Sequence, residues 1–219
     1  MKKDYFIFDM DGVIVDSEPA HRKILNTVFD ELGLNFSNEY HQTLVGMAAV
    51  PMWKKIKKDY GIHTNANELV NFHREIILFE MEKIDVQPVP GVLQFLQQLK
   101  SQNFHISLAS SSTRKLISLF MDKFEIATYF DYLVSGDDVE RSKPNPDIFL
   151  KVAEKYNISP NNFIVVEDSY NGVTAAKAAG MMCVGYVNSN SGNQDLSAAD
   201  MIINDFAELN IDKIKELTT

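Results

Sequence analysis

Short, almost continuous apolar segments alternate with amphipathic segments along much of this chain, and this alternation limits the possible folds more than any other feature. Near-continuous apolar segments are typical of parallel strands that are buried on both faces of a sheet. We predict six such strands, at residues 5–8, 106–109, 132–134, 163–166, 184–187 and 201–203. Strands that alternate with helices indicate an α/β fold, here a Rossmann-like, doubly wound parallel sheet.

The predicted helices between these strands begin and end at residues that suit helix termini. They span residues 90–102, 113–124, 145–156 and 169–180. We expect Asn145 to be an N-cap, with Pro146 at the first helical position. Gly180 is expected directly after the last of these helices, because glycine readily adopts the left-handed conformation of that position.

The segment after the first strand differs from the rest because it contains no convincing strand. Its apolar periodicity predicts helices over residues 17–33, 50–61 and 65–84. Ser17 is expected to cap the first of these helices, and Gly33 to end it. The first strand is thus followed at once by a long helical insertion.

An insertion of this length divides the chain into two domains. A chain that leaves a core domain and re-enters it forms a cap that is joined to the core by two linkers. We expect a core domain of residues 1–15 and 88–219 and a small α-helical cap domain of residues 16–87. The hinge between them would lie near residues 15–17 and 85–88.

Charge and composition exclude several classes of partner. The formal net charge is -9, which argues against nucleic acid or an anionic membrane as the main partner. No segment approaches the roughly 18 apolar residues of a membrane span. The single cysteine, Cys183, excludes an internal disulfide and fits a reducing compartment. We expect a cytoplasmic protein and, with no obvious interface segment, a monomer.

Polar residues follow four of the predicted strands, at or soon after the point where each strand ends. In a parallel sheet these ends form one edge, where ligands bind. Taken singly, such residues are often turn or helix caps or solvated side chains. Together, the carboxylates on this edge would repel one another unless a hard divalent cation, naturally Mg²⁺, lay among them. The residues are Asp9 and Asp11, Ser110 and Ser111, Lys143, and Glu167 and Asp168.

Four segments carry a resemblance to a known family. The segments DMDGVIVDS, LASSS, SKPNPDIF and VVEDS, which begin at Asp9, Leu108, Ser142 and Val165, resemble the four ordered motifs of the haloacid dehalogenase superfamily of phosphotransferases. The resemblance extends over residues 5–187. The helical insertion resembles the C1 cap of the β-phosphoglucomutase-like subgroup.

The resemblance implies a role for each of these residues. Asp9 would be the nucleophile that attacks phosphorus. Asp11 would be the general acid that protonates the leaving oxygen and then the base that activates water. Ser110 and the backbone amide of Ser111 would bind phosphate oxygens. Lys143 would steady the nucleophile and the charge of the transition state.

The resemblance also implies a magnesium site and a reaction class. Mg²⁺ would be held by Asp9, by the backbone carbonyl of Asp11 and by Asp168, with Glu167 as a further ligand or next to the ligands. Members of the superfamily that break carbon–halogen bonds typically lack the pair formed by Asp9 and Asp11. The pair therefore points to phosphoryl chemistry.

The cap bears on the choice of substrate. Residues 44–55 resemble the cap specificity loop, with Gly46 at its pivot. In β-phosphoglucomutases this loop typically offers a Lys just before the Gly and an Arg three residues after it, where this chain has Val45 and Ala49. His21 stands at the position of a His that, in the mutases, couples substrate binding to cap closure.

Val45 and Ala49, together with the DSEP stretch at residues 16–19 that is common in sugar-phosphate phosphatases of the subgroup, favour a phosphatase of small phosphorylated metabolites, with sugar phosphates foremost. His21 discriminates little, since similar phosphatases often carry it too. The alternative is a β-phosphoglucomutase that interconverts β-glucose 1-phosphate and glucose 6-phosphate. A pyrophosphatase, a phosphonate hydrolase and a non-catalytic binding module are weaker alternatives, and the complete set of motif residues argues against the last of these.

Several cap residues remain open to two interpretations. Met47, Met52 and Trp53 could form an apolar wall over a substrate, or could pack the interior of the cap. His73, Arg74 or one of the nearby lysines could bind a distal anionic group, although a dense run of lysines is more often a solvated helix face. The lysines are Lys54, Lys55, Lys57 and Lys58.

Overall fold

The computed structural model describes residues 4–35, 37–209 and 211 of the chain. Within these residues, six strands form one parallel sheet in the order β3-β2-β1-β4-β5-β6. The strands are β1 (Tyr5–Phe8), β2 (His105–Ala109), β3 (Tyr132–Val134), β4 (Phe163–Glu167), β5 (Met182–Tyr186) and β6 (Met201–Ile203). The predicted α/β fold is confirmed.

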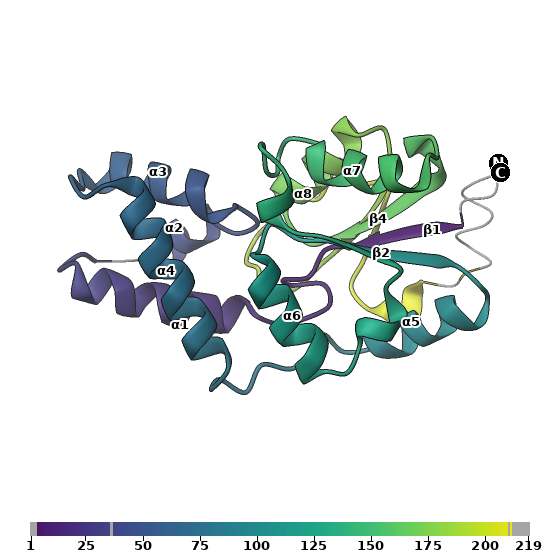
Figure 1. Ribbon diagram of the computed structural model, residues 1–219, viewed down its shortest axis with the longest axis horizontal. Coiled ribbons are helices and arrows are strands. Elements are labelled where there is room, and N and C mark those ends of the chain that lie inside the picture. The colour runs from purple at the N-terminus through teal and green to yellow at the C-terminus, as the bar shows by residue number, and fades with distance from the viewer. Residues whose placement is uncertain (1–3, 36, 210, 212–219) are drawn as a thin grey trace.

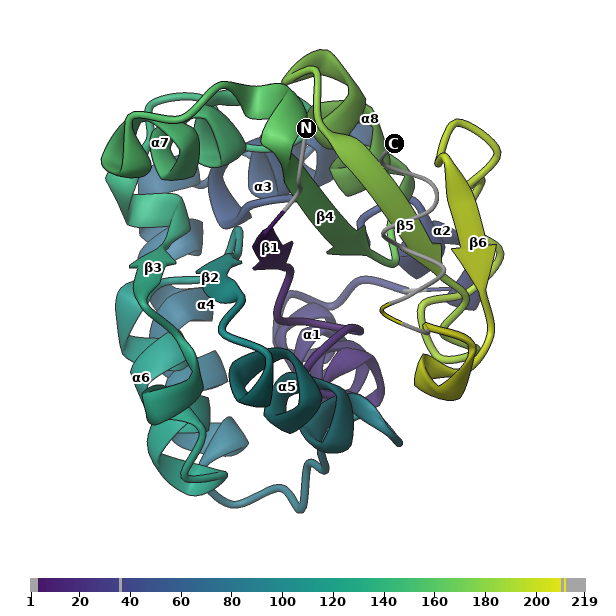
Figure 2. The ribbon, with the colours of Figure 1, turned by 90° about the vertical axis from the view of Figure 1, so that its right-hand side faces the viewer.

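The central strand β1 shows why the sheet needs helices on both faces. Phe6 and Phe8 pack into one hydrophobic cluster, and Ile7 between them packs into another. Successive side chains of a strand point to opposite faces, so both faces of β1 are apolar and must be covered. Helices α5 (Val92–Ser101) and α6 (Arg114–Lys123) cover the first face. Helices α7 (Asp147–Tyr156) and α8 (Tyr170–Ala178) cover the second (Figure 2).

Two boundary predictions in this region are wrong. Asn145 is not the N-cap of α7, because its side-chain amide instead donates to the Ser142 carbonyl at 3.0 Å, and Pro146 takes the N-cap position. Strand β5 begins at Met182 rather than at residue 184, since Met182 already pairs with Ile164 of β4. Gly180 does follow α8, with a φ of 74°.

A second group of helices lies at one end of the molecule, away from most of the sheet (Figure 1). It consists of α1 (Glu18–Glu31), α2 (Asn38–Gln42), α3 (Ala49–Tyr60) and α4 (Ala66–Met81). Helix α2 was not predicted, because five residues are too few for a helical period to be visible. These helices have a hydrophobic cluster of their own around the fully buried Trp53. The interior interpretation of Trp53 is thus the right one.

Two linker segments of the chain join the helical group to the sheet. Val15 pairs antiparallel with Pro88, and the Asp16 N–H donates to the Gln87 carbonyl at 2.9 Å. These paired linkers lie where the hinge is expected. The division into residues 16–87 and the remainder stays a prediction, and we use the word cap for the helical group α1–α4.

Four shorter helical elements lie in the connections before or after strands β3, β4 and β6. They are the 3₁₀ helices η1 (Ala127–Tyr129), η2 (Gly136–Asp138), η3 (Pro160–Asn162) and η4 (Phe206–Glu208). Among the described helices, none combines the length and the apolar character that crossing a membrane requires. The expectations of a cytoplasmic location and of a monomer stay predictions.

Candidate active site

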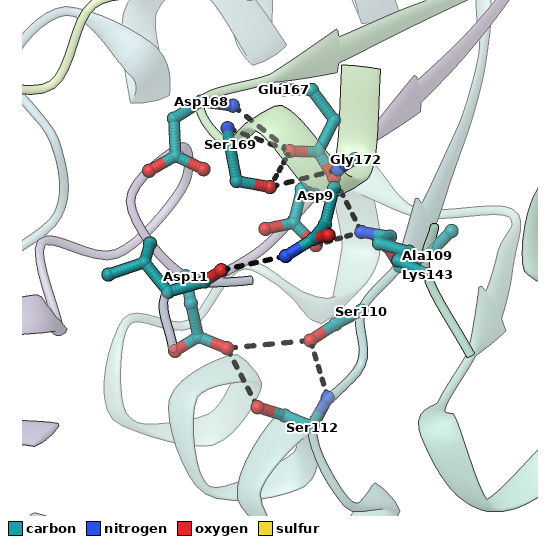
Figure 3. A network of polar contacts seen from close by, with 12 residues as sticks. Asp9, Asp11, Ala109, Ser110, Ser112, Lys143, Glu167, Asp168, Ser169 and Gly172 are labelled. Atoms are coloured by element: carbon teal, nitrogen blue, oxygen red, sulfur yellow. Dashed lines mark hydrogen bonds and ion pairs between the residues drawn. The ribbon is translucent and has the colours of Figure 1, made fainter. Parts of the chain in front are cut away.

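The polar residues that follow the strands do meet at one edge of the sheet, and Figure 3 shows contacts among them. Asp9 is the first residue after β1, and its N–H still donates to the Val166 carbonyl at 3.0 Å, so β4 fixes its backbone. Asp9 is 7% exposed. Because β1 lies between β2 and β4, the loops after all three strands reach this point. The sheet order therefore gathers residues that are far apart in the sequence.

Lys143 is the buried cation of the site. Its Nζ donates to Asp9 Oδ1 at 2.6 Å, to Glu167 Oε1 at 2.6 Å and to the Ala109 carbonyl at 3.0 Å. Burial by itself would lower the pKa of the ammonium, but the charges of Asp9 and Glu167 outweigh it and hold the pKa above its ordinary value. Lys143 therefore stays charged and orients the Asp9 carboxylate.

Both oxygens of Glu167 are occupied by the protein. Oε1 accepts from Lys143, while Oε2 accepts from the N–H groups of Asp168 and Ser169 and from Ser169 Oγ, at 3.0–3.2 Å. A Cβ added at Gly172 would lie 1.8 Å from the Glu167 carboxyl carbon, so only glycine fits there. These contacts fix the orientation of Glu167 and, through it, of Lys143.

An acidic cluster lies beside Lys143. Ligand atoms of Asp9, Glu167 and Asp168 lie within 4.8 Å of one another. Burial raises the pKa of Asp9 to about 8 despite the opposing charge of Lys143, and burial together with Glu167 and Asp9 raises the pKa of Asp168. A divalent cation would relieve this mutual repulsion, and the oxygen-only donors suit a hard ion. The cluster is therefore able to bind a metal such as Mg²⁺.

The Asp168 carboxylate is held on the side facing the β1 loop. Its Oδ2 accepts from Ser191 Oγ, and a Cβ added at Gly12 would lie 1.9 Å from the same oxygen. Ser191 was not predicted. It belongs to the loop after β5, and the only signal for it in the sequence is that it lies in a run of polar residues.

Asp11 lies in a second network, formed between the core and the cap. Its Oδ1 accepts from Ser17 Oγ at 2.6 Å and lies 3.0 Å from His21 Nε2, and its Oδ2 accepts from Ser112 Oγ at 2.7 Å. Burial alone would raise its pKa, but the hydrogen bond and charge of His21, with the hydroxyls of Ser17 and Ser112, lower it to about 2. Asp11 is therefore ionised in this arrangement.

The same contacts explain His21 and Ser17. Burial opposes the charge of His21, yet Asp11 raises its pKa above the ordinary value, so the two side chains form a charged pair. Ser17 stands at the N-cap position of α1, but its side chain makes no capping hydrogen bond. The prediction that Ser17 caps the helix is wrong in this respect, because its hydroxyl bonds to Asp11 instead.

The serines after β2 differ from one another. Ser110 Oγ accepts from the Ser112 N–H at 3.0 Å and lies 3.5 Å from Asp11 Oδ2, so its hydroxyl is used within the protein. Ser111 Oγ is buried and has no hydrogen-bond partner among the described residues, although it lies on the cavity wall. Buried hydroxyls seldom lack a partner. Ser111 thus offers a hydrogen bond to a ligand, whereas Ser112, whose contact with Asp11 was not predicted, orients Asp11.

A cavity of about 120 Å³ lies over Asp9, Asp11, Lys143 and Asp168 and extends into the cap. Its cap wall combines apolar and polar side chains, and none of the four lysines of α3 is among the described residues that line it. The cap residues on the wall are Glu18, His21, Leu25, His41, Leu44, Val45, Gly46, Met47, Ala49, Met52, His73, Arg74, Ile77 and Leu78.

The cap touches the core around this cavity. Asn171 Nδ2 donates to the Val45 carbonyl at 3.2 Å, and Arg74 lies 3.1 Å from Asp137. Gly46 has a φ of 73°, and a Cβ added there would lie 2.5 Å from Ser169 Oγ. Gly46 therefore lines the cavity and lets the cap loop approach the core closely.

The comparisons with known proteins agree on one family. The haloacid dehalogenase-like hydrolase family matches residues 6–186. The Bacillus subtilis protein YhcW is 32% identical over 206 residues, which cover 94% of this chain and 93% of that protein. The phosphorylated carbohydrates phosphatase of Thermotoga maritima is 31% identical over 178 residues, which cover 80% of this chain and 81% of that protein.

A solved structure, the β-phosphoglucomutase of Clostridium difficile, is similar with a TM-score of 0.86 over 100% of this chain and 97% of that one. Its sequence is 24% identical to this chain. At this level of identity the similarity shows a common fold.

Proposed function

The chain belongs to the haloacid dehalogenase-like hydrolases, and on that premise we propose that it is a Mg²⁺-dependent phosphatase that hydrolyses small phosphorylated metabolites, foremost sugar phosphates, through an aspartyl-phosphate. The observation that carries the proposal is the buried Lys143 between Asp9 and Glu167, next to Asp168 and under a cavity that reaches into the cap. The name of the Thermotoga maritima relative supports phosphorylated carbohydrates as substrates.

The first half-reaction uses Asp9 as nucleophile. The nucleophile is the ionised form of Asp9, which the charge of Lys143 and of a bound cation would favour over the protonated form. A carboxylate oxygen of Asp9 attacks phosphorus, the bond from phosphorus to the ester oxygen breaks, and Asp9 becomes an aspartyl-phosphate. Lys143 at 2.6 Å holds the carboxylate in place and attracts the negative charge of the phosphoryl oxygens. The free Ser111 hydroxyl donates to one of these oxygens.

Asp11 and His21 both take part in the proton transfer to the leaving oxygen. The leaving oxygen needs a proton, and because Asp11 is ionised in this arrangement, it must first receive one. His21 holds a proton 3.0 Å away and can supply it through Asp11. In the second half-reaction the Asp11 carboxylate removes a proton from water as the water attacks phosphorus, the bond to Asp9 breaks, and inorganic phosphate leaves.

Asp9, Asp168 and the backbone carbonyl of Asp11 would hold Mg²⁺, with Glu167 adjacent. The ion supplies positive charge that offsets the charge of the carboxylates and of the phosphate. Glu167 already has both oxygens engaged, so its main contribution in this proposal is to position Lys143.

The mutase alternative makes different demands on the cap. A mutase has to hold a second phosphate away from the reacting one, and Val45 and Ala49 place apolar side chains on the cavity wall where the mutase loop has Lys and Arg. The fold similarity to a β-phosphoglucomutase does not distinguish the two activities, because both use the same first half-reaction.

The proposal is tested by measuring phosphate release from sugar phosphates, nucleotides and pyrophosphate, with Mg²⁺ and with a chelator. A parallel assay follows β-glucose 1-phosphate to glucose 6-phosphate with a bisphosphate primer. Mg²⁺-dependent phosphate release from sugar phosphates without isomerisation is the expected result. Isomerisation with little phosphate release would replace the proposal by the mutase, and no turnover in either assay would reject both.

A further inference from the structure

The loop between β5 and β6 reaches the acidic cluster, although none of the roles proposed above uses it. We call residues 188–194 the β5 loop. Two of its polar side chains are buried, since Asn188 and Ser191 are 7% and 1% exposed. Buried polar side chains are held by hydrogen bonds, so their partners show what the loop holds in place.

The Asp168 carboxylate depends on this loop for its orientation. Ser191 Oγ donates to Asp168 Oδ2, and no other side chain among the described residues donates a hydrogen bond to this carboxylate. Glu167, in contrast, has both oxygens engaged by several groups. The ligand atoms of the cluster lie within 4.8 Å of one another, and like charges at this distance repel. Without Ser191, this repulsion would favour a rotation of the Asp168 side chain away from the cluster.

The turn after β1 packs on the same pair of side chains. A Cβ added at Gly12 would lie 1.9 Å from Asp168 Oδ2 and 2.9 Å from Ser191 Oγ. Asn188 Nδ2 donates to the Gly12 carbonyl at 2.9 Å. The β5 loop and this turn are therefore joined to each other, with the contact between Ser191 and Asp168 enclosed between them.

The backbone of Ser191 is fixed on both sides. Its N–H donates to the Asn188 carbonyl at 3.1 Å, and its carbonyl accepts from Gln194 Nε2 at 3.0 Å. Gln194 Oε1 in turn accepts from the Tyr170 N–H at 3.1 Å, at the start of α8. Because both backbone groups of Ser191 are engaged, its hydroxyl has a defined place relative to Asp168.

The path of the β5 loop does not require the Ser191 hydroxyl. Asn188 Oδ1 accepts from the Asn190 N–H at 2.8 Å, and Asn190 Nδ2 donates to Asp16 Oδ2 at 2.8 Å. These contacts, together with those of Gln194, shape the loop and attach it to its surroundings. The hydroxyl of Ser191 is thus available for Asp168 alone.

Resting on the Mg²⁺-dependent phosphatase function proposed above, we propose that Ser191 is a positioning residue for the metal site. It holds Asp168 by Oδ2, so that the carboxylate stays beside Asp9 and is oriented for Mg²⁺ before any substrate arrives. Ser191 is not among the residues that line the cavity, and it acts on the reaction only through Asp168.

The test measures Mg²⁺ binding in the absence of substrate, by isothermal titration calorimetry with MgCl₂. For Ser191→Ala we expect the Kd of Mg²⁺ to rise by about 10–10²-fold, the usual effect of removing a hydrogen-bond partner of a metal ligand. Ser189→Ala changes an exposed serine of the same loop and is the matched control, which should leave the Kd as it is in the wild type.

A second variant separates the hydrogen bond from the packing. Ser191→Cys fills nearly the same space, but its thiol is only a weak donor, and a soft thiol is a poor ligand for Mg²⁺. We expect the Kd to rise in this variant as well. Thermal unfolding without Mg²⁺ establishes that each variant is folded.

Phosphate release gives a readout that a merely structural role would not move. In both Ser191 variants the Mg²⁺ concentration for half-maximal activity should rise with the Kd. At saturating Mg²⁺, kcat and the KM of the ester should change far less. A loss of kcat that is the same at every Mg²⁺ concentration would overturn the inference, because Ser191 would then act on something other than metal binding.

The outcomes distinguish this inference from the proposed function. If the wild type binds no Mg²⁺, the Mg²⁺-dependent function and the inference both fail. If the wild type binds Mg²⁺ and both Ser191 variants bind it equally tightly, the inference alone is overturned. Weaker binding in both variants, with no phosphate release from any ester by the wild type, would support the inference and reject the phosphatase.

Discussion

The polar groups on the core side of the cavity and those on its cap side differ in whether the protein already provides their hydrogen-bond partners. On the core side, Lys143, Glu167 and Asp11 are each held by several partners of the protein itself. On the cap side, His73 Nδ1 and Arg74 Nε are buried without a hydrogen-bond partner among the described residues. Paired groups are preorganised before any ligand arrives, which is what electrostatic catalysis requires. His73 and Arg74 both line the cavity, so their unpaired atoms are open to a ligand there.

Apart from His21, the residue of cap helix α1 that supplies the proton, this contrast assigns the chemistry to the core and the selection of substrate to the cap. Ser111 is the instructive exception on the core side, because its unpaired hydroxyl lies where a phosphate would bind. The contrast predicts that changes in the core side affect all substrates alike, and that changes in the cap affect some substrates more than others. Variants on either side test this prediction.

The largest effect is expected from Asp9→Asn. An amide does not attack phosphorus, so kcat should fall by at least about 10⁴-fold for every substrate. Phosphate release from a panel of esters measures this. Asp30→Asn, an exposed residue on α1, is the control. Turnover retained by Asp9→Asn with any substrate would show that the nucleophile lies elsewhere.

Asp11→Asn should slow turnover by roughly 10²–10⁴-fold, the usual contribution of a general acid and base. The loss in the first half-reaction should be smaller for para-nitrophenyl phosphate, whose leaving group needs no proton. Rapid-mixing measurements should then show a burst of para-nitrophenol followed by slow hydrolysis of the aspartyl-phosphate. Equal loss in both half-reactions with this substrate would contradict the acid role.

Gly46→Ala tests the contact between the two sides. The new methyl would meet Ser169 Oγ at 2.5 Å, so the cap loop could not approach the core as closely. We expect kcat/KM to fall by about 10–10²-fold, since small displacements of a site have effects of this size. Gly33→Ala is the matched control, because Gly33 has a φ of 67° with no atom within 4 Å of an added Cβ. Equal losses in both variants would mean that backbone strain, and not the contact, is responsible.

The smallest effect concerns the stability of the cap. His73 has a pKa of about 3 when folded, well below the ordinary value of about 6.5, so below pH 6.5 only the unfolded state takes up the proton. Stability is therefore lost as the pH falls, by about 2 kcal/mol at pH 5 from this residue.

Thermal unfolding at pH 7.5 and pH 5 measures this loss. The fall in Tm between the two pH values should be smaller in His73→Gln by roughly 4–8 °C. The exposed His63→Gln should leave the fall as it is in the wild type. Because buried carboxyls such as Glu18 titrate in the opposite sense, the difference between variant and wild type is the informative quantity. If the fall in Tm were the same in His73→Gln as in the wild type, His73 would take up its proton in the folded cap as readily as in the unfolded chain.

Much of the core could be predicted from the sequence, because its strands and the residues at their ends follow from contiguous residues. The apolar segment before Asp9 has to be a buried strand, so Asp9 has to stand at its end, and the same holds for Ser110 and for Glu167. The cap was predictable only as a set of helices. Its apolar periodicity indicates which residues face inward, but it does not distinguish a residue of the cap interior, such as Trp53, from a residue of the cavity wall, such as Met52.

The parallel sheet, the helical segment after the first strand and the positions of the motif residues at the strand ends can all be predicted from the sequence. These follow from contiguous patterns of apolar and polar residues. Three contacts could not be predicted in this way: the Ser17 hydroxyl bonds to Asp11 and does not cap its own helix, Ser191 holds Asp168, and Arg74 reaches Asp137. Each of these contacts joins side chains brought together by the packing of separate elements, and a hydroxyl or guanidinium with several candidate partners selects among them only when that packing fixes the distances.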